Sequence, residues 1–174
     1  EAAVEELSVD AAVVQVGSTA RNTWLPEDRD IDVFVCFPPE LTRDELEAYG
    51  LEVGHAVLPN GREEYAEHPY VVGSVDGYDV DLVPCYAVES ATAIESAVDR
   101  TPFHTRYVED RLAAAEGSAE TLADDIRVLK AFLTAIGVYG SDLKTRGFSG
   151  YLTELLVLEY GSSRAVLEAA ANEW

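Results

Sequence analysis

DIDVFVCF, residues 30–37, is the stretch of this sequence that decides the fold. Its pattern predicts a β-strand, in which successive side chains point to opposite faces of a sheet. Asp30 and Asp32 then share one face with Phe34 and Cys36. The other face is formed by four apolar side chains, namely Ile31, Val33, Val35 and Phe37. A carboxylate in an otherwise apolar strand is costly to bury unless it is paired. The stretch therefore predicts that the two aspartates project together into a metal site or a pocket.

A second decisive strand is predicted over residues 78–88, YDVDLVPCYAV. It follows Asp76-Gly77, a pair of residues that strongly favours a tight hairpin turn. The strand would therefore pair with the segment before the turn. Its odd positions share one face and carry Asp79, Asp81 and Val83.

These aspartates predict a site for divalent cations, because magnesium prefers carboxylate oxygens, phosphates and water. We expect Asp30 and Asp32 to converge on one ion, and Asp81 to complete a second site from a strand of the same sheet. Asp79 is the alternative ligand. In so acidic a chain an isolated Asp-x-Asp pair is more often a solvated surface feature, so the apolar context carries the prediction.

The segment before residue 30 has a strand, a turn and a helix start. VVQV at 13–16 predicts a short buried strand, closed by Gly17, and Ser18 is a suitable N-cap for a helix over residues 19–24. Backbone N–H groups at a helix start, the Ser18 hydroxyl and Arg21 could together hold a triphosphate. Gly-Ser before a helix is also common as a plain turn and cap.

The region from residue 38 to residue 77 connects the two aspartate strands. Thr42 and Glu45 have the spacing of a capping box and predict the start of a helix. Asn60-Gly61 indicates a turn. Residues 64–75, EYAEHPYVVGSV, are expected to be extended.

After Glu89 the apolar residues recur with helical spacing. The sequence predicts four helices, at residues 103–115, 119–136, 149–160 and 163–173. Strands first and helices second indicate an α+β domain followed by the start of a helical one. We expect the first to span residues 1–101 and the second residues 102–174.

The composition of the chain narrows the classes of protein to which it can belong. The chain of 174 residues has 33 acidic and 12 basic residues and a net charge of -21. Such a surface is tolerable where molar salt shortens the Debye length to roughly 3 Å, so we expect a halophilic source.

There is no apolar run long enough to cross a bilayer, which favours a cytoplasmic protein without a membrane partner. Cys36 and Cys85 lack zinc-ligand spacing and are expected to be buried free thiols. The chain opens inside an apparently helical stretch, so we expect a fragment of a longer protein.

Six longer strings resemble one family in particular. They are VGSTARNTWL, RDIDVFV, YAEHPYVVG, VDLVPCY, DRTPFHTR and RGFSGYLTELL, at residues 16–25, 29–35, 65–73, 80–86, 99–106 and 146–156. Together they resemble the archaeal (class I) CCA-adding tRNA nucleotidyltransferases, within the polymerase-beta-like nucleotidyltransferase superfamily. The resemblance implies a palm domain with a mixed sheet and flanking helices, followed by part of a helical central domain.

The resemblance also implies an activity. It predicts template-independent addition of C, C and A to the 3′ end of tRNA from CTP and ATP, with release of pyrophosphate. Two magnesium ions would be held by Asp30, Asp32 and Asp81, which serve as the catalytic carboxylates. The first of these positions is often glutamate in the family, so Asp30 is shorter by one methylene. A homodimer of the full-length protein is one arrangement that the family allows.

Six further positions match residues that contact the nucleotide in that family. They are Gly17, Ser18, Arg21, His104 in TPFHTR, Lys130 in VLKAFL and Tyr139 in GVYGSD. From the residues alone, Lys130 could equally lie on a helix surface, His104 could be a structural histidine, and Tyr139 could belong to the core.

Two other functions stay open from the sequence. One is another RNA nucleotidyltransferase, such as a poly(A) polymerase or an oligoadenylate-synthase-like enzyme, which could share the metal site. The other is a non-catalytic, acidic RNA-binding module. Because the tRNA-binding region of the family extends beyond the matched strings, we expect residues 1–174 alone to bind nucleotides and metal only weakly.

Overall fold

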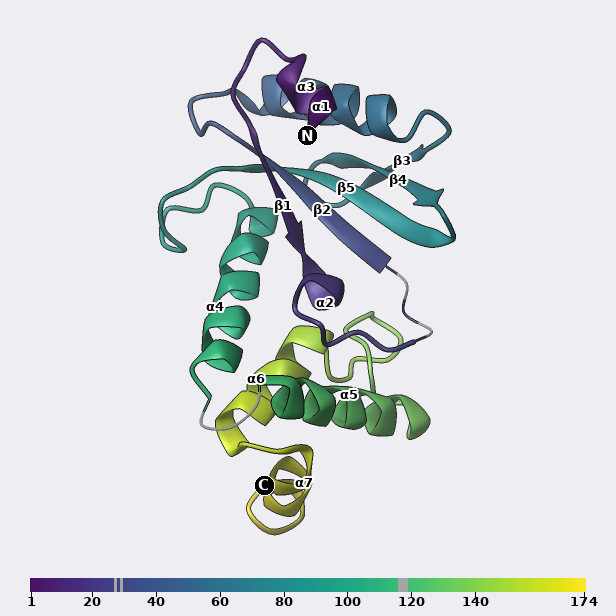
Figure 1. Ribbon diagram of the computed structural model, residues 1–174, viewed down its shortest axis with the longest axis vertical. Helices are drawn as coiled ribbons and strands as arrows, with labels where there is room; N and C mark the ends of the chain where they lie inside the picture. Colours follow the sequence, from purple (N-terminus) through teal and green to yellow (C-terminus); the bar gives the residue numbers. More distant parts are fainter. Residues whose placement is uncertain (27, 29, 116–118) are drawn as a thin grey trace. The chain divides into compact units, whose positions relative to one another are not determined.

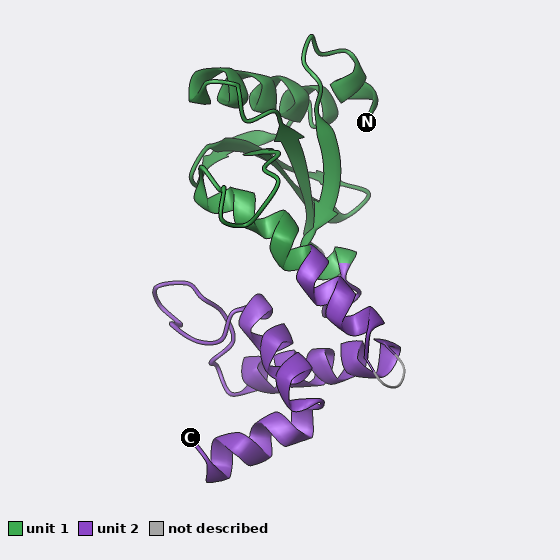
Figure 2. Cartoon of the chain, turned by 90° about the vertical axis from the view of Figure 1, so that its left-hand side faces the viewer, with its two compact units in different colours: residues 1–20, 29–105 green, residues 21–28, 106–174 purple. Residues whose placement is uncertain are grey.

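The computed structural model describes residues 1–26, 28, 30–115 and 119–174. These residues form two compact units (Figure 2). The first unit contains residues 1–20 and 29–105, and the second contains residues 21–28 and 106–174. The division falls within one helix, α4 (Thr101–Ala113). The predicted domain boundary after residue 101 stays a prediction.

The first unit is built on a five-stranded sheet with the order β1-β2-β5-β4-β3 (Figure 1). Its strands are β1 (Ala12–Val16), β2 (Asp30–Phe37), β3 (Arg62–Tyr65), β4 (Pro69–Val75) and β5 (Tyr78–Tyr86). β2 and β5 are parallel, whereas the other neighbouring pairs are antiparallel, so the sheet is mixed. The two strands that carry the aspartates are therefore central neighbours, as the sequence predicted.

The two faces of β2 are divided as its alternation predicted. Val35 and Phe37 belong to one apolar cluster, against which Ile31 and Val33 pack. Phe34 and Cys36 belong to a separate cluster on the other face, the face shared with the aspartates. Phe37 is fully buried, and burying a side chain of this size contributes roughly 1.5–3 kcal/mol. A shift of the strand by one residue would reverse both faces, so the apolar side chains fix where the aspartates point.

α3 (Arg43–Val57) covers the apolar face of the sheet, with the short α1 (Ala2–Glu5) beside it (Figure 1). The predicted capping box is confirmed, because the Thr42 hydroxyl accepts a hydrogen bond from the Glu45 N–H and the Glu45 carboxylate accepts one from the Thr42 N–H. Leu46 and Val53 are buried against the strands. The helix thus holds the sheet from one side and leaves the aspartate face to other groups.

Two local predictions before β5 have different outcomes. The hairpin at Asp76-Gly77 is confirmed, and both residues have positive φ angles of 52° and 83°. The prediction of one extended segment over residues 64–75 is wrong, because it contains a turn between the antiparallel strands β3 and β4. A backbone hydrogen bond from the Ala66 N–H to the His68 carbonyl closes this turn. The turn contains no glycine, which is the residue that most often signals one in a sequence.

The predicted helix over residues 19–24 is also wrong. α2 spans only Gly17–Ala20, and Ser18 lies inside it rather than at its N-cap. Asn22 has a left-handed φ of 55°, a conformation that ends a right-handed helix. The chain then passes into the second unit at Arg21.

Helices form the second unit. They are the later part of α4, α5 (Ala119–Ala135), α6 (Gly150–Tyr160) and α7 (Ser163–Asn172). A short 3-10 helix, η1 (Ala97–Arg100), precedes α4 in the chain. Ile126, Leu129 and Val157 are fully or almost fully buried in the core of this unit. Ser149 and Ser162 cap α6 and α7 with their side chains. The four predicted helices are confirmed, with small shifts at their ends.

Two further predictions, that the cysteines are buried free thiols and that no segment spans a membrane, can be compared with the structure. Cys36 and Cys85 are buried free thiols, as predicted, and their Sγ atoms lie 3.1 Å apart on β2 and β5. In the part of the chain that the structure describes, every helix is too short or too polar to cross a membrane.

Candidate active site

Four aspartates lie side by side near the N-terminal ends of β2 and β5, two neighbouring interior strands of the first unit's sheet. In the parallel pairing of β2 with β5, Asp32 is opposite Asp81 and Asp30 is opposite Asp79. Residues in register on neighbouring strands project from the same face. The sequence predicted the strand positions, and the pairing shows that the carboxylates come from adjacent backbones fixed by hydrogen bonds.

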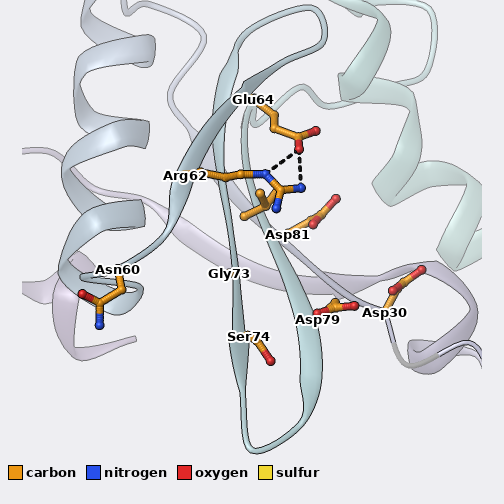
Figure 3. A pocket seen from close by; sticks show the side chains of 9 residues that line it. Asp30, Asn60, Arg62, Glu64, Gly73, Ser74, Asp79 and Asp81 are labelled. Carbon is orange, nitrogen blue, oxygen red and sulfur yellow. Dashed lines mark hydrogen bonds and ion pairs between the residues drawn. The ribbon is translucent and has the colours of Figure 1, made fainter.

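A cavity of about 460 Å³ opens beside three of these carboxylates, and Asp32 is the one that does not line it (Figure 3). It is lined by Asp30, Asn60, Arg62, Glu64, Val72, Gly73, Ser74, Asp79 and Asp81. The Arg62 side chain extends across the cavity near Asp81, and its Nη2 and Nε atoms donate hydrogen bonds of 2.5 and 2.9 Å to Glu64. Sequence reasoning missed Arg62 and Glu64, because it did not predict the separate strand β3 that carries them.

Asp81 is a carboxylate whose pKa is shifted by its surroundings. Burial, followed by the neighbouring Glu64 carboxylate, raises the pKa of Asp81, and the Arg62 guanidinium opposes that shift. The ionised form is therefore disfavoured here unless further positive charge is present. A bound cation would supply that charge, so the electrostatics fit a cation site.

The donor set can be compared with the needs of a divalent ion. All four side chains offer only carboxylate oxygens, which suit a hard cation such as magnesium. Among the described residues, however, no three His, Cys, Asp or Glu side chains converge closely enough to hold an ion as they are placed. β2 and β5 nevertheless hold the four aspartates in register on neighbouring strands, and the residues fit the ion chemically.

Gly17 makes a close approach to this site. It has a left-handed φ of 78°, and a Cβ atom at this position would collide with the Asp32 carboxylate. Only a glycine combines that backbone conformation with that proximity at low cost. The absence of a side chain at Gly17 thus leaves room for the Asp32 carboxylate.

Gly17→Ala is expected to weaken divalent-ion binding about tenfold or more, because the methyl group would displace Asp32 in addition to a strain of roughly 1–2 kcal/mol. Gly77→Ala is the matched control, since Gly77 has a φ of 83° but nothing lies within 4 Å of the place that its Cβ would take. Calorimetric titration with Mn²⁺ measures the effect. Equal affinities for the two variants would show that the contact with Asp32 has no part in the site.

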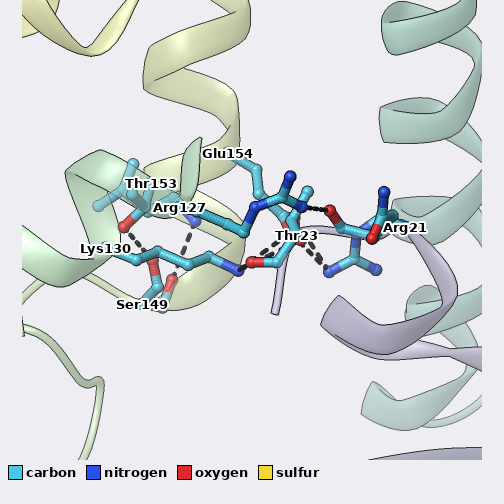
Figure 4. A network of polar contacts seen from close by, with 9 residues as sticks. Arg21, Thr23, Arg127, Lys130, Ser149, Thr153 and Glu154 are labelled. Atoms are coloured by element: carbon cyan, nitrogen blue, oxygen red, sulfur yellow. Dashed lines mark hydrogen bonds and ion pairs between the residues drawn. The ribbon is translucent and has the colours of Figure 1, made fainter. Parts of the chain in front are cut away.

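A second cluster of charged groups is buried within the second unit (Figure 4). The Lys130 ammonium lies 3.0 Å from the Thr23 carbonyl, 3.3 Å from the Thr23 hydroxyl and 3.4 Å from Glu154 Oε1. The Arg21 guanidinium lies 2.9 Å from Glu154 Oε2. The Thr23 hydroxyl donates a hydrogen bond of 2.5 Å to Glu154 Oε1. Two of the nucleotide-binding candidates, Arg21 and Lys130, therefore share one carboxylate.

Lys130 is fully buried, so a surface role for it is wrong. Burial lowers the pKa of Lys130, and the Glu154 carboxylate opposes this effect. Arg21 adds a smaller lowering contribution, while Asp28 acts in the opposite direction. The Glu154 carboxylate thus favours the charged form of Lys130 against the effect of burial.

Tyr139 lies close to Lys130. A Cβ atom on Gly150, the first residue of α6, would be 3.0 Å from the Tyr139 hydroxyl and 3.8 Å from the Lys130 ammonium. Burial, with smaller contributions from Asp28 and Glu154, raises the pKa of Tyr139 to about 12. The phenol therefore keeps its proton at neutral pH and can donate a hydrogen bond.

The remaining candidates belong to the first unit. Ser18 lies in α2, directly after Gly17, and His104 lies in the first turn of α4, where it is half-buried. The structure thus groups Asp30, Asp32 and Asp81 with Gly17 in one unit, and Arg21, Lys130 and Tyr139 in the other. Glu154 and Thr23 were missed by sequence reasoning. A carboxylate inside the apolar helix segment LTELLVL was the available signal for Glu154.

The chain belongs to the nucleotidyltransferase domain family, whose model matches residues 1–104. A second model, described as the second domain of tRNA nucleotidyltransferases, matches residues 124–174. More particularly, the chain is similar to archaeal CCA-adding enzymes. It is 69% identical over 172 residues to the CCA-adding enzyme of Haloarcula marismortui, an alignment that covers 99% of this chain and 36% of that protein.

The chain is also similar to the CCA-adding enzymes of other archaea. The CCA-adding enzyme of Halobacterium salinarum is 63% identical over 174 residues, covering 100% of this chain and 37% of that protein. That of Methanocaldococcus jannaschii is 52% identical over 164 residues, covering 92% and 35%. The chain thus spans little more than a third of the length of these relatives. Some relatives are halophilic, as the acidic composition led us to expect.

Solved structures support the predicted fold class. The Cid1 poly(U) polymerase has a TM-score of 0.64 at 15% identity, covering 91% of this chain and 45% of that one. CdnC of E. coli MS115-1 with ATP has a TM-score of 0.58 at 19% identity, covering 95% and 57%. At such identities the likeness concerns the fold alone. The prediction of a polymerase-beta-like mixed sheet with flanking helices is confirmed.

Proposed function

We propose that residues 1–174 are the catalytic portion of an enzyme that adds C, C and A to the 3′ end of tRNA from CTP and ATP and releases pyrophosphate. The observation that carries this proposal is the 69% identity to a CCA-adding enzyme over 99% of the chain. The paired carboxylates on β2 and β5 support it chemically, because nucleotidyl transfer requires hard cations beside the reacting phosphate.

In this proposal Asp30, Asp32 and Asp81 are the catalytic carboxylates and hold two Mg²⁺ ions. Bound there, the ions would lower the pKa of the attacking 3′-hydroxyl and neutralise charge on the leaving pyrophosphate. Asp81 is the residue we assign to the hydroxyl, as a ligand of the same ion or as the proton acceptor. Gly17 leaves the space that the Asp32 carboxylate occupies.

The nucleotide would be bound by Gly17, Ser18, Arg21, His104, Lys130 and Tyr139. Arg21 and Lys130 supply positive charge for the triphosphate, and the protonated phenol of Tyr139 supplies a hydrogen bond. The catalytic palm domain would span residues 1–101, and the start of the helical central domain residues 102–174. In this proposal, binding of tRNA depends on further parts of the full-length protein. We propose that this protein is cytoplasmic and forms a homodimer.

The decisive test uses the full-length protein and a tRNA transcript that ends before CCA. With CTP alone the transcript should gain two cytidines and stop, and later addition of ATP should add one adenosine. Long adenosine runs from ATP alone would instead indicate a poly(A) polymerase. No incorporation of either nucleotide in the presence of Mg²⁺ would indicate a non-catalytic binding module. Both of those outcomes contradict the proposal.

A further inference from the structure

Glu154 has an unusual position for an acidic residue of this chain. Its side chain is fully buried in α6, although the chain carries 33 acidic residues and a net charge of -21. A buried carboxylate is costly unless cations and hydrogen bonds compensate it. An acidic surface in salt accounts for exposed carboxylates, but it does not account for this one.

The contacts of Glu154 connect three separate segments of the second unit (Figure 4). Glu154 itself lies on α6, Lys130 lies on α5, and Arg21 with Thr23 lies in the segment 21–28. Its two oxygens are 2.9 Å from Arg21 and 3.4 Å from Lys130. The Thr23 hydroxyl fixes one of those oxygens with a hydrogen bond of 2.5 Å. One carboxylate therefore sets the positions of two cationic side chains that come from different elements.

The Lys130 ammonium is held in a single position by this arrangement. Its partners are the carbonyl and hydroxyl of Thr23 and the Glu154 carboxylate, at distances between 3.0 and 3.4 Å. A free lysine has a flexible four-carbon chain, whose motion must be lost before the ammonium can hold an anion. A lysine that is already fixed avoids this loss on binding.

We propose that Glu154 is a positioning residue, which holds Arg21 and Lys130 where they bind the triphosphate of the incoming nucleotide. This inference rests on the proposed function for the identity of the anion. Glu154 does not touch the nucleotide, because its side chain is fully buried: Oε1 accepts bonds from Arg21, Thr23 and Lys130, and Oε2 is paired with Arg21.

Glu154→Gln tests the proposal in the full-length protein. The amide keeps the shape of the side chain and can still accept the bond from Thr23, but it has no charge. We expect the KM for ATP to rise on the order of tenfold or more, the effect of losing one interaction between charged groups. Glu154→Asp should restore part of the affinity. Glu159→Gln, at an exposed position of the same helix, is the matched control and should leave KM unchanged.

The pH profile separates positioning from mere folding. The groups that act on the Lys130 pKa are Glu154, Arg21 and Asp28. In Glu154→Gln the effects of burial and Arg21, which lower the pKa, remain, whereas the larger of the two opposing contributions is lost. Lys130 then releases its proton at lower pH, so the alkaline limb of kcat/KM should move to lower pH. A folded Glu154→Gln variant with the KM and alkaline limb of the parent protein would overturn the proposal.

Two further measurements keep the test conclusive. NMR titration of ¹⁵N-labelled lysine, assigned with Lys130→Arg, follows the Lys130 pKa without any need for activity. If the parent protein incorporates no nucleotide, the proposed function fails, while an unchanged Lys130 pKa in Glu154→Gln would still overturn the role of Glu154. Should that variant not fold, Thr23→Val removes the hydroxyl that donates to Glu154 and accepts a bond from Lys130, and so disturbs the same arrangement without removing its charges. It should raise KM in the same direction, and an unchanged KM would contradict the proposal.

Discussion

Asp81→Asn is expected to lower nucleotide incorporation by the full-length protein by at least about a thousandfold, the effect of losing several kcal/mol of transition-state stabilisation by a metal-bound carboxylate. The substitution should not destabilise the folded state. Burial and the Glu64 carboxylate raise the pKa of Asp81, which means that its ionised form opposes folding at neutral pH. The neutral asparagine removes that penalty. Without divalent ions, the urea midpoint of the variant should therefore equal or exceed that of the parent protein.

The matched control for Asp81→Asn is Asp79→Asn. Both aspartates lie on β5 and project from the same face, but Asp79 is exposed and pairs with Asp30, whereas Asp81 pairs with Asp32. We expect Asp79→Asn to retain activity within about threefold, because surface changes usually alter free energies by no more than about 0.5 kcal/mol. Single-turnover incorporation of CTP measures both variants. If the two effects were reversed, Asp79 and not Asp81 would be the catalytic ligand.

The carboxylate site shows how much the sequence could predict. Strict alternation in DIDVFVCF determines which side chains of β2 are buried under α3, and therefore where Asp30 and Asp32 point. Asp76-Gly77 marks the start of β5 in the same way. Both signals are local, since each depends on neighbouring residues in the chain. The pairing of β2 with β5 is not local, because strands with intervening elements can be ordered in several ways.

Two physical causes explain why these residues were missed. Arg62 and Glu64 lie on β3, an edge strand whose composition does not distinguish it from a polar loop. Glu154 and Thr23 acquire their roles only through contacts with residues more than twenty positions away. The predicted helix after Ser18 failed because Asn22 took a left-handed conformation, which the helix-start signals do not exclude. Long-range polar contacts leave no periodic pattern, so they emerge only from the fold.

Lys130→Met is expected to destabilise the protein more than any of the other substitutions proposed above. Methionine can occupy the space of the lysine chain, but it cannot bond the Thr23 carbonyl or compensate Glu154. Removing one partner of a buried ion pair costs about 3–5 kcal/mol of stability. For Lys130→Met we expect a loss near the lower value of this range, because Arg21 remains beside Glu154. Nucleotide incorporation should fall by about a hundredfold or more, since a fixed cation at the triphosphate is lost. Urea unfolding at constant salt and steady-state kinetics measure the two effects.

Lys144→Met is the control, because Lys144 is the other of the two lysines and is exposed. It should change the unfolding free energy by no more than about 0.5 kcal/mol and leave activity intact.

The double variant Lys130→Met/Glu154→Gln then separates stability from function. It no longer buries an undercompensated carboxylate, so its loss of stability should be smaller than the sum of the two single losses. Activity should stay as low as in Lys130→Met, because removing the carboxylate does not return the cation. Additive stability losses would mean that Lys130 and Glu154 do not interact, and recovered activity would mean that the nucleotide does not need the Lys130 charge.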